Sequence, residues 1–223
     1  NRDVRGCITV GAPNVTIRNV KVTYSGFYPI RAFDHPGVVI EDVEVNLGGN
    51  LNSGGVEASE IRRAFIHNGS DCGGFNTDQV YEDNLCSLGP DANNDGWADS
   101  ASFCRRSSAH FDGYQSGSLV QNITIRHNTI RNPCSQTSAI LVGHVDGGSK
   151  NIVIDRNLVA GGGYTIYCED RQQKVPMTLT NNRFARTFFR RAGYYGPTTA
   201  CNGSNVTASG NVWDDTGAPL RRR

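Results

Sequence analysis

The sequence has little of several features that mark other classes of protein. It contains one methionine and three lysines, and no apolar run comes near the roughly 20 residues of a membrane span. Lysine plus arginine (22) almost cancel aspartate plus glutamate (21), so neither a nucleic-acid partner nor a membrane partner is expected. The periodicity of an amphipathic helix is also missing, which disfavours repeats that alternate strands with helices.

The residues that are present indicate an exported, β-rich chain. Glycine is abundant at 26 residues, and short runs of Val, Ile, Thr and Asn recur. Seven cysteines, with no C-x-x-C pair and no zinc-like spacing to histidine, indicate disulfides and therefore secretion. Seven is odd and Cys7 lies near the first residue, so we expect its partner in sequence upstream of residue 1. The length of 223 residues suits one domain, which we interpret as a monomer.

A repeat organises the chain. Eight segments approach the pattern x-V-x-I-x-x-N-x-V, and they begin at residues 14, 37, 58, 77, 122, 151, 176 and 205. Apolar and polar residues alternate in them, as at Ile123 and Ile125, which predicts strands with one buried face. The seventh position of the last five segments holds Asp83, Asn128, Asn157, Asn182 and Asn211. Stacked asparagines can bond from one repeat to the next, so a ladder is expected here.

This organisation resembles the right-handed parallel β-helix proteins of the pectate-lyase-like group. The resemblance covers nearly the whole chain. It implies an all-β, single-domain right-handed parallel β-helix of about eight coils over residues 1–223, with one long loop insertion at 86–109. The resemblance is specific for architecture and weak for activity, because this fold carries lyases, hydrolases, epimerases and inert adhesins.

The insertion holds a candidate calcium loop. Its spacing, D-x-N-x-D-G-x-x-D, matches the first nine positions of an EF-hand loop. The predicted ligands are Asp91, Asn93, Asp95, the carbonyl of Trp97, and Asp99. Ser102 stands where a bidentate glutamate is expected, so the affinity should be reduced. We therefore expect a structural Ca²⁺ ion, against the alternative of a polar loop without an ion.

The stretch AHFDGYQSGS, residues 109–118, is the candidate catalytic strand. Alternation assigns Phe111 to the core and predicts that His110, Asp112 and Tyr114 point outward. A second H-x-D-G lies one coil later at 144–147. In register, the two copies would face one ligand, because stacked coils are about 4.8 Å apart.

Neighbouring coils extend this surface into a strip of acids, imidazoles, Arg and Tyr. The candidate catalytic residues are His110, Asp112, His144, Asp146 and Asp71. The candidate sugar-binding residues are Tyr114, Gln115, Tyr164, Tyr167, Arg190, Tyr194 and Tyr195. Aromatic faces stack on sugar rings and polar edges bond hydroxyls, so the strip suits an extended polysaccharide.

Three functions fit the strip. The leading interpretation is a lyase that cleaves a uronic-acid polymer by β-elimination, with His110 as base or acid and a cation or Arg neutralising the uronate. The first alternative is a polygalacturonase-like glycoside hydrolase, which needs two carboxyls such as Asp71 or Asp146 with Asp112. The second alternative is a carbohydrate-binding or structural solenoid without turnover.

Overall fold

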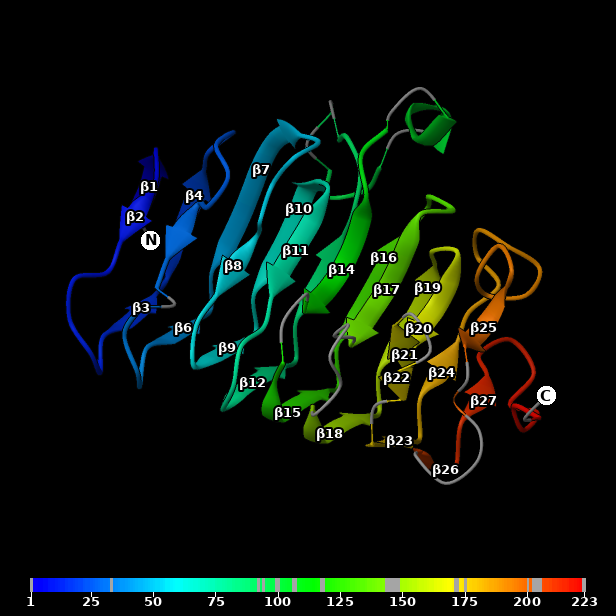
Figure 1. Ribbon diagram of the computed structural model, residues 1–223. Coiled ribbons are helices and arrows are strands. Elements are labelled where there is room, and N and C mark those ends of the chain that lie inside the picture. Colours follow the sequence, from blue (N-terminus) through cyan, green and yellow to red (C-terminus); the bar gives the residue numbers. More distant parts are fainter. Residues whose placement is uncertain are drawn as a thin grey trace.

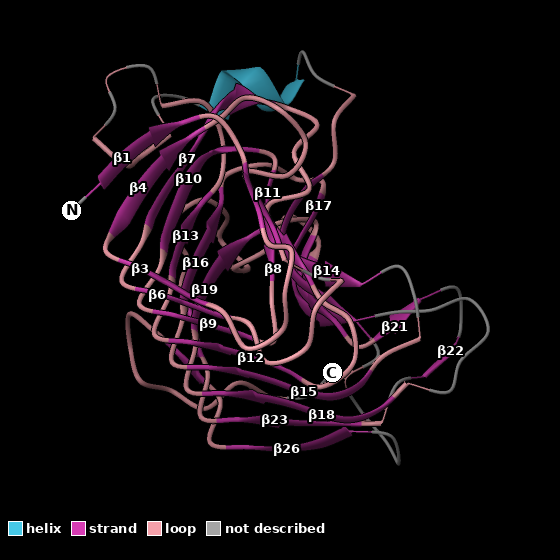
Figure 2. Ribbon diagram, turned by 90° about the vertical axis from the view of Figure 1, so that its left-hand side faces the viewer, coloured by secondary structure: helices cyan, strands magenta, loops and turns pink. Residues whose placement is uncertain are grey.

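The protein is an all-β parallel β-helix, which confirms the predicted architecture (Figure 1). The structure is a computed structural model, and it describes residues 2–32, 34–91, 93, 95–98, 101–105, 108–116, 119–142, 149–170, 173–174, 176–199, 201 and 206–221. Strands of successive coils pair in parallel and form three walls around an apolar interior (Figure 2).

The eight repeats build the second wall and, together with β1 before the first repeat, the first wall. The first wall is β1 (Arg2–Arg5), β4 (Val20–Thr23), β7 (Glu44–Asn50), β10 (Phe65–Gly69), β13 (Leu85–Ser87), β16 (Thr129–Asn132), β19 (Leu158–Gly161), β24 (Arg183–Phe184) and β27 (Val212–Trp213). The second wall is β3 (Thr16–Arg18), β6 (Val39–Glu41), β9 (Glu60–Arg62), β12 (Gln79–Glu82), β15 (Gln121–Arg126), β18 (Lys150–Asp155), β23 (Met177–Thr180) and β26 (Val206–Ser209). Each repeat supplies a second-wall strand, a corner and a first-wall strand.

The third wall carries the candidate site. Its first part is β2 (Ile8–Thr9), β5 (Ile30–Arg31) and β8 (Val56–Glu57). Its second part is β11 (Asp71–Gly74), β14 (Phe111–Ser116), β17 (Thr137–Val142), β20 (Tyr164–Tyr167) and β25 (Gly196–Thr199). β8 packs beside β11, so the two parts continue one another. Outside the walls lie the short hairpin β21 (Glu169–Asp170) and β22 (Gln173–Lys174) and the 3₁₀ helix η1 (Ala101–Arg105).

Each repeat turns the corner through one residue in the left-handed backbone conformation. These residues are Asn19, Asp42, Arg63, Asp83, His127, Arg156, Asn181 and Gly210. The left-handed region is uncommon for residues other than glycine, so its recurrence in every repeat shows that the corner imposes it. In four of the last five repeats the sequence interpretation placed the turn residue one position too late, at the asparagine that follows, whereas Asp83 is the turn residue itself.

That following asparagine forms the predicted ladder. It consists of Asn84, Asn128, Asn157, Asn182 and Asn211, and each backbone N–H donates to the side-chain oxygen of the next rung at 2.9–3.0 Å. Asn84 therefore replaces Asp83 in the predicted set, because the register pairs Leu85 with Thr129. The three central rungs are at most 1% exposed, so the ladder satisfies buried corner backbone that water cannot reach.

Asn157→Ala is expected to destabilise the protein by about 2–4 kcal/mol, because it orphans several buried groups. The Asn157 amide donates to the carbonyl of Ile125, and its oxygen accepts from the backbone and side chain of Asn128. Chemical denaturation measures the loss. Asn211→Ala is the matched control: it lies on the last rung described and is partly buried, so its cost should be clearly smaller. Equal costs would contradict this view of the ladder.

Three disulfides brace the coils. They join Cys72 to Cys86, Cys104 of η1 to Cys134, and Cys168 to Cys201, and they are compatible with an extracellular protein. Cys7 is free and exposed. None of the helices described is long and apolar enough to cross a membrane.

Candidate active site

The third wall bends at the candidate catalytic strand. Two consecutive residues are buried in each of four neighbouring strands: Cys72 and Gly73, Gly113 and Tyr114, Ala139 and Ile140, and Thr165 and Ile166. Outward positions on either side of the bend are therefore three residues apart, as at Tyr164 and Tyr167, whose rings touch at a centroid distance of 5.6 Å. Simple alternation, which the sequence interpretation assumed, does not hold across such a bend.

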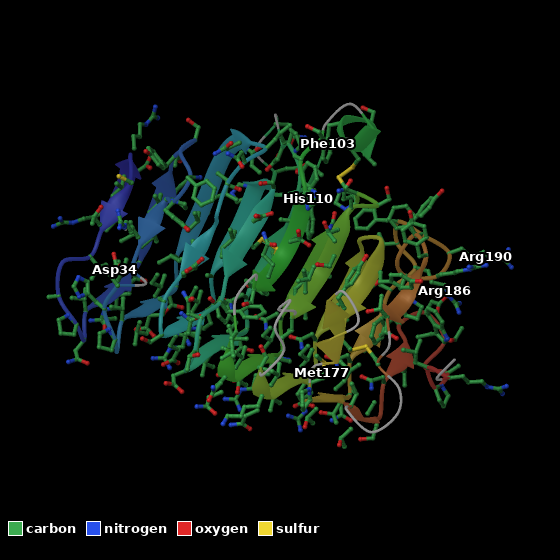
Figure 3. All side chains as sticks on the ribbon, in the orientation of Figure 1. Asp34, Phe103, His110, Met177, Arg186 and Arg190 are labelled. Carbon is green, nitrogen blue, oxygen red and sulfur yellow. A yellow bond between two sulfur atoms is a disulfide. The ribbon has the colours of Figure 1, made fainter. Side chains whose placement is uncertain are left out.

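Asp112, which was predicted to be exposed, is buried at 1% exposure. The bend overturns the predicted orientation of Tyr114. Its side chain is fully buried and packs against Tyr81 in the core, with the ring centroids 4.8 Å apart. Phe111 is buried as predicted and contacts Phe103 of η1. His110 is exposed directly before β14 (Figure 3), and its ring nitrogens lie 2.9 Å from the Gln136 amide and 3.3 Å from the Thr137 hydroxyl.

Asp71 and Asp112 lie side by side on neighbouring coils, as predicted. The ladder between β11 and β14 pairs them directly, and the Asp112 backbone N–H donates to Asp71 Oδ1 at 3.1 Å. The Gln115 amide donates to Asp71 Oδ2 at 2.9 Å, and the Ser138 hydroxyl donates to Asp112 Oδ1. Asp112 Oδ2 is buried and has no hydrogen-bond partner within the part of the chain described. An unpaired buried carboxyl oxygen costs free energy, and the cost is larger when the group is ionised, so burial disfavours the charged form of Asp112.

That environment separates the protonation states of the two acids. Burial, and next the negative charge of Asp112, raise the pKa of Asp71 to about 8. Burial raises the pKa of Asp112 to about 6, opposed by the Ser138 hydrogen bond and the charge of His110. At pH 7 Asp71 therefore holds its proton, whereas Asp112 is ionised.

Two adjoining hollows open beside Asp71, and together they form what we call the acid groove. The smaller, of about 230 Å³, is lined by Phe27, Tyr28, Gly54, Glu57, Asp71, Gly74, Phe75, Asn76, Gln115 and Ser116. The larger, of about 640 Å³, is lined by Phe27, Asn50, Leu51, Asn52, Ser53, Ser70, Asp71, Ser108, Ala109, His110 and Gln115. Asp71 and Gln115 line both hollows, whereas Asp112 lies behind them.

Glu57 is the carboxyl that the sequence interpretation missed. It lines the smaller hollow with Asp71, and burial raises the pKa of its side chain, opposed by a 3.0 Å hydrogen bond from the Asn76 amide. A signal for it exists in the repeat. Glu57 directly precedes the repeat that begins at residue 58, and it lies on the third wall, which Gln115 also occupies two coils later along the chain.

The other four predicted tyrosines, Tyr164, Tyr167, Tyr194 and Tyr195, form one cluster towards the C-terminal end of the third wall. Tyr164 contacts Tyr167 and Tyr195, and Tyr195 contacts Tyr194 at 4.9 Å between ring centroids. Tyr194 and Tyr195 are each 57% exposed. The register carries Gln115 through Leu141 to Tyr167, so this tyrosine cluster lies on the same line as the acid groove. Arg190 is exposed and extends away from the ribbon (Figure 3).

The candidate calcium loop is closed by its own hydrogen bonds. Asp91 is buried and accepts from the backbone N–H groups of Asp95 and Gly96, and its Oδ2 lies 3.0 Å from His67 Nδ1. Asp95 Oδ1 accepts from the Trp97 N–H, and the Asn93 amide donates to Asp95 Oδ2. Among the residues described, no three His, Cys, Asp or Glu side chains gather in a way that could hold a metal.

The side-chain oxygens of Asp91, Asn93 and Asp95 that were predicted as ligands thus accept hydrogen bonds within the loop. Asp99 lies outside the described residues, so calcium binding stays a prediction. His144 and Asp146 of the second H-x-D-G also lie outside the described residues.

Melting the protein with and without a calcium chelator tests the loop. A bound ion stabilises only the folded state, so its removal should lower the melting temperature. An unchanged melting temperature, together with no calcium by elemental analysis, would remove calcium from the account. Asp91→Asn should then still loosen the insertion, because it weakens the contact with His67.

Comparison with known proteins adds no relative. The chain matches no protein-family model, no curated protein and no solved structure. Its chemistry must be inferred from the side chains of the groove.

Proposed function

We propose that the protein is a secreted glycoside hydrolase that cleaves an extended, uncharged polysaccharide lying along the third wall. The observation that carries this proposal is the pair of carboxyls, Glu57 and Asp71, that line one hollow with pKa values raised by burial. Two carboxyls that flank a sugar linkage are the usual apparatus of glycosidic hydrolysis. The resemblance to the pectate-lyase-like group agrees with a carbohydrate substrate, but only as an analogy of fold.

Asp71 is the acid in this proposal. Its pKa of about 8 keeps it protonated at neutral pH, so it can protonate the oxygen of the departing sugar as the bond to the anomeric carbon breaks. Glu57, in its ionised form, takes a proton from the water that attacks that carbon. One water is consumed, and transfer of the proton from Glu57 to Asp71 through solvent restores both groups.

Asp112 acts through Asp71 rather than on the substrate. It lies behind the groove, and its negative charge helps to keep Asp71 protonated. Asp112→Asn should therefore lower the pKa of Asp71 and move the alkaline limb of the pH–rate profile to lower pH, by about one unit. A residue with a merely structural role would lower activity evenly across pH. An unmoved alkaline limb in an active variant would remove Asp112 from the mechanism.

The two hollows offer no lysine or arginine, within the part of the chain described, that could neutralise the carboxylate of a uronate, as a lyase requires. β-Elimination requires a cation or strong donor to neutralise the carboxylate beside the proton that is removed. Arg31 is next to Glu57 in the ladder, but it forms an ion pair with Asp34 at 3.2 Å. An uncharged polysaccharide therefore fits the groove better than a polyuronate.

Incubation with two sets of polymers tests the proposed reaction. The uncharged set is xylan, galactomannan and β-glucan, and the charged set is polygalacturonate and alginate. We expect new reducing ends from an uncharged polymer, without the ultraviolet absorbance of an unsaturated product. That absorbance would identify a lyase, and binding without new ends would favour a non-catalytic solenoid. Either result would overturn the hydrolase.

A further inference from the structure

Two aromatic rings, one exposed and one half-buried, lie on the N-terminal side of the acid groove and have no role in the proposed hydrolysis. Phe27 is 47% exposed, and it meets Tyr28 edge to face at 4.6 Å between ring centroids. Phe27 lines both hollows, and Tyr28 lines the smaller one beside Glu57. We call Phe27 and Tyr28 the aromatic platform.

Gly54 lies directly beneath the platform, and its lack of a side chain leaves room for both rings. A Cβ added at Gly54 would lie 2.3 Å from a ring atom of Phe27 and 2.6 Å from one of Tyr28, so both rings cover this glycine closely. The Gly54 N–H also donates to the Phe27 carbonyl at 2.8 Å. Burial and the neighbouring charge of Glu57 raise the pKa of the Tyr28 hydroxyl, in keeping with a ring set against the groove wall.

The platform and the tyrosine cluster lie on opposite sides of Asp71. The strand order from β5, which follows Tyr28, to β20, which carries the cluster, is β5, β8, β11, β14, β17 and β20. Five steps of ~4.8 Å give a track of about 24 Å, with Asp71 on the third strand. Such a track is long enough for several sugar units. Aromatic faces at both ends can hold a chain that continues in both directions.

We propose that the aromatic platform is a second sugar-binding subsite, and that with the tyrosine cluster it makes the enzyme cleave inside an uncharged chain rather than at its end. The class of polymer and its cleavage inside the chain rest on the proposed function. Sugar binding by the platform can be measured separately, without any cleavage. Phe27 presents a ring face to the sugar, and Asn76 and Gln115 lie beside it to bond hydroxyls.

Affinity electrophoresis through gels of xylan, galactomannan or β-glucan tests the platform, with Asp71→Asn as the parent so that no polymer is cut. Retardation of the parent by at least one polymer is expected, and Phe27→Ala should weaken it about five- to thirtyfold, by analogy with losing one buried aromatic contact. Phe27→Trp should restore binding. Trp97→Ala is the matched control, because this exposed ring lies on the insertion against Arg131.

Binding that Phe27→Ala leaves unchanged, or a parent retarded by none of the three polymers, would overturn the platform. In the unmodified enzyme, viscosity should fall well before many reducing ends appear, since internal cuts shorten chains fastest. Release of only mono- and disaccharides from the start would overturn internal cleavage. Platform-dependent binding without any cleavage would instead refute the hydrolase and leave the platform standing.

Discussion

Asp71→Asn is expected to lower the rate of glycosidic cleavage by about 10²- to 10⁴-fold, the usual contribution of a positioned acid. The amide keeps the shape of the carboxyl and a hydrogen bond with Gln115, but it has no acidic proton to give to the leaving oxygen. Affinity for the polymer should change little, so the loss should fall on kcat rather than on KM. Reducing-end assays across substrate concentrations, with melting curves to verify folding, measure the effect.

Asp83→Asn is the matched control for this variant. Asp83 is also an aspartate on a coil, but it lies at the corner between the first and second walls and pairs with His127. Asparagine suits its left-handed backbone, so folding and activity should both survive. An Asp71→Asn protein that retains more than about a tenth of the activity would remove Asp71 as the acid.

The stability of the protein should fall between pH 5 and pH 7 because of Asp71. Its folded pKa of about 8 lies far above the value of about 3.9 for an unfolded aspartate, so the folded state keeps a proton that the unfolded state has released. This contribution to stability is fully present below about pH 4 and is lost as the pH rises toward 8. At about 1.4 kcal/mol per unit, two units cost about 2–3 kcal/mol.

Asp71→Asn removes this titration. The free energy of unfolding of the variant, relative to that of the unmodified protein, should therefore rise by about 2–3 kcal/mol between pH 5 and pH 7. The same difference should appear as roughly 5–10 °C in melting temperature. Urea unfolding at several pH values compares the two slopes, and Asp83→Asn controls for the loss of one acid. Parallel slopes for Asp71→Asn and the unmodified protein would contradict the raised pKa. Asp71 would then not be protonated at neutral pH, and it could not act as the catalytic acid.

The repeat made the architecture predictable, because strand alternation recurs along the eight segments and the last five segments also carry the ladder asparagine. The adjacency of Asp71 and Asp112 also followed from counting coils. The error at Asp83 arose because the residue that takes the left-handed conformation directly precedes the ladder asparagine, and Asp and Asn are similar in sequence. Only the register between β13 and β16 distinguishes the two positions.

The details of the site were harder to predict for a physical reason. A strand that bends places two residues in a row inward, and nothing in HFDGYQ marks Tyr114 as the second of them. Glu57 and Phe27 reach the groove from coils 14 and 44 residues before Asp71 along the chain. Their proximity depends on how loops of unequal length bring successive strands into register. The periodic pattern of the sequence does not predict that register.

The central claim is that Asp71 remains protonated at neutral pH, and a carboxyl-carbon NMR titration measures this directly. The Asp71 resonance is assigned by its loss in Asp71→Asn and then followed from pH 4 to pH 9. We expect a midpoint near 8 in the unmodified protein and a lower midpoint in Asp112→Asn, because burial and the Asp112 charge are the two causes of the shift. A midpoint below about 5 in the unmodified protein would contradict the account, since Asp71 would then have no proton to give at neutral pH.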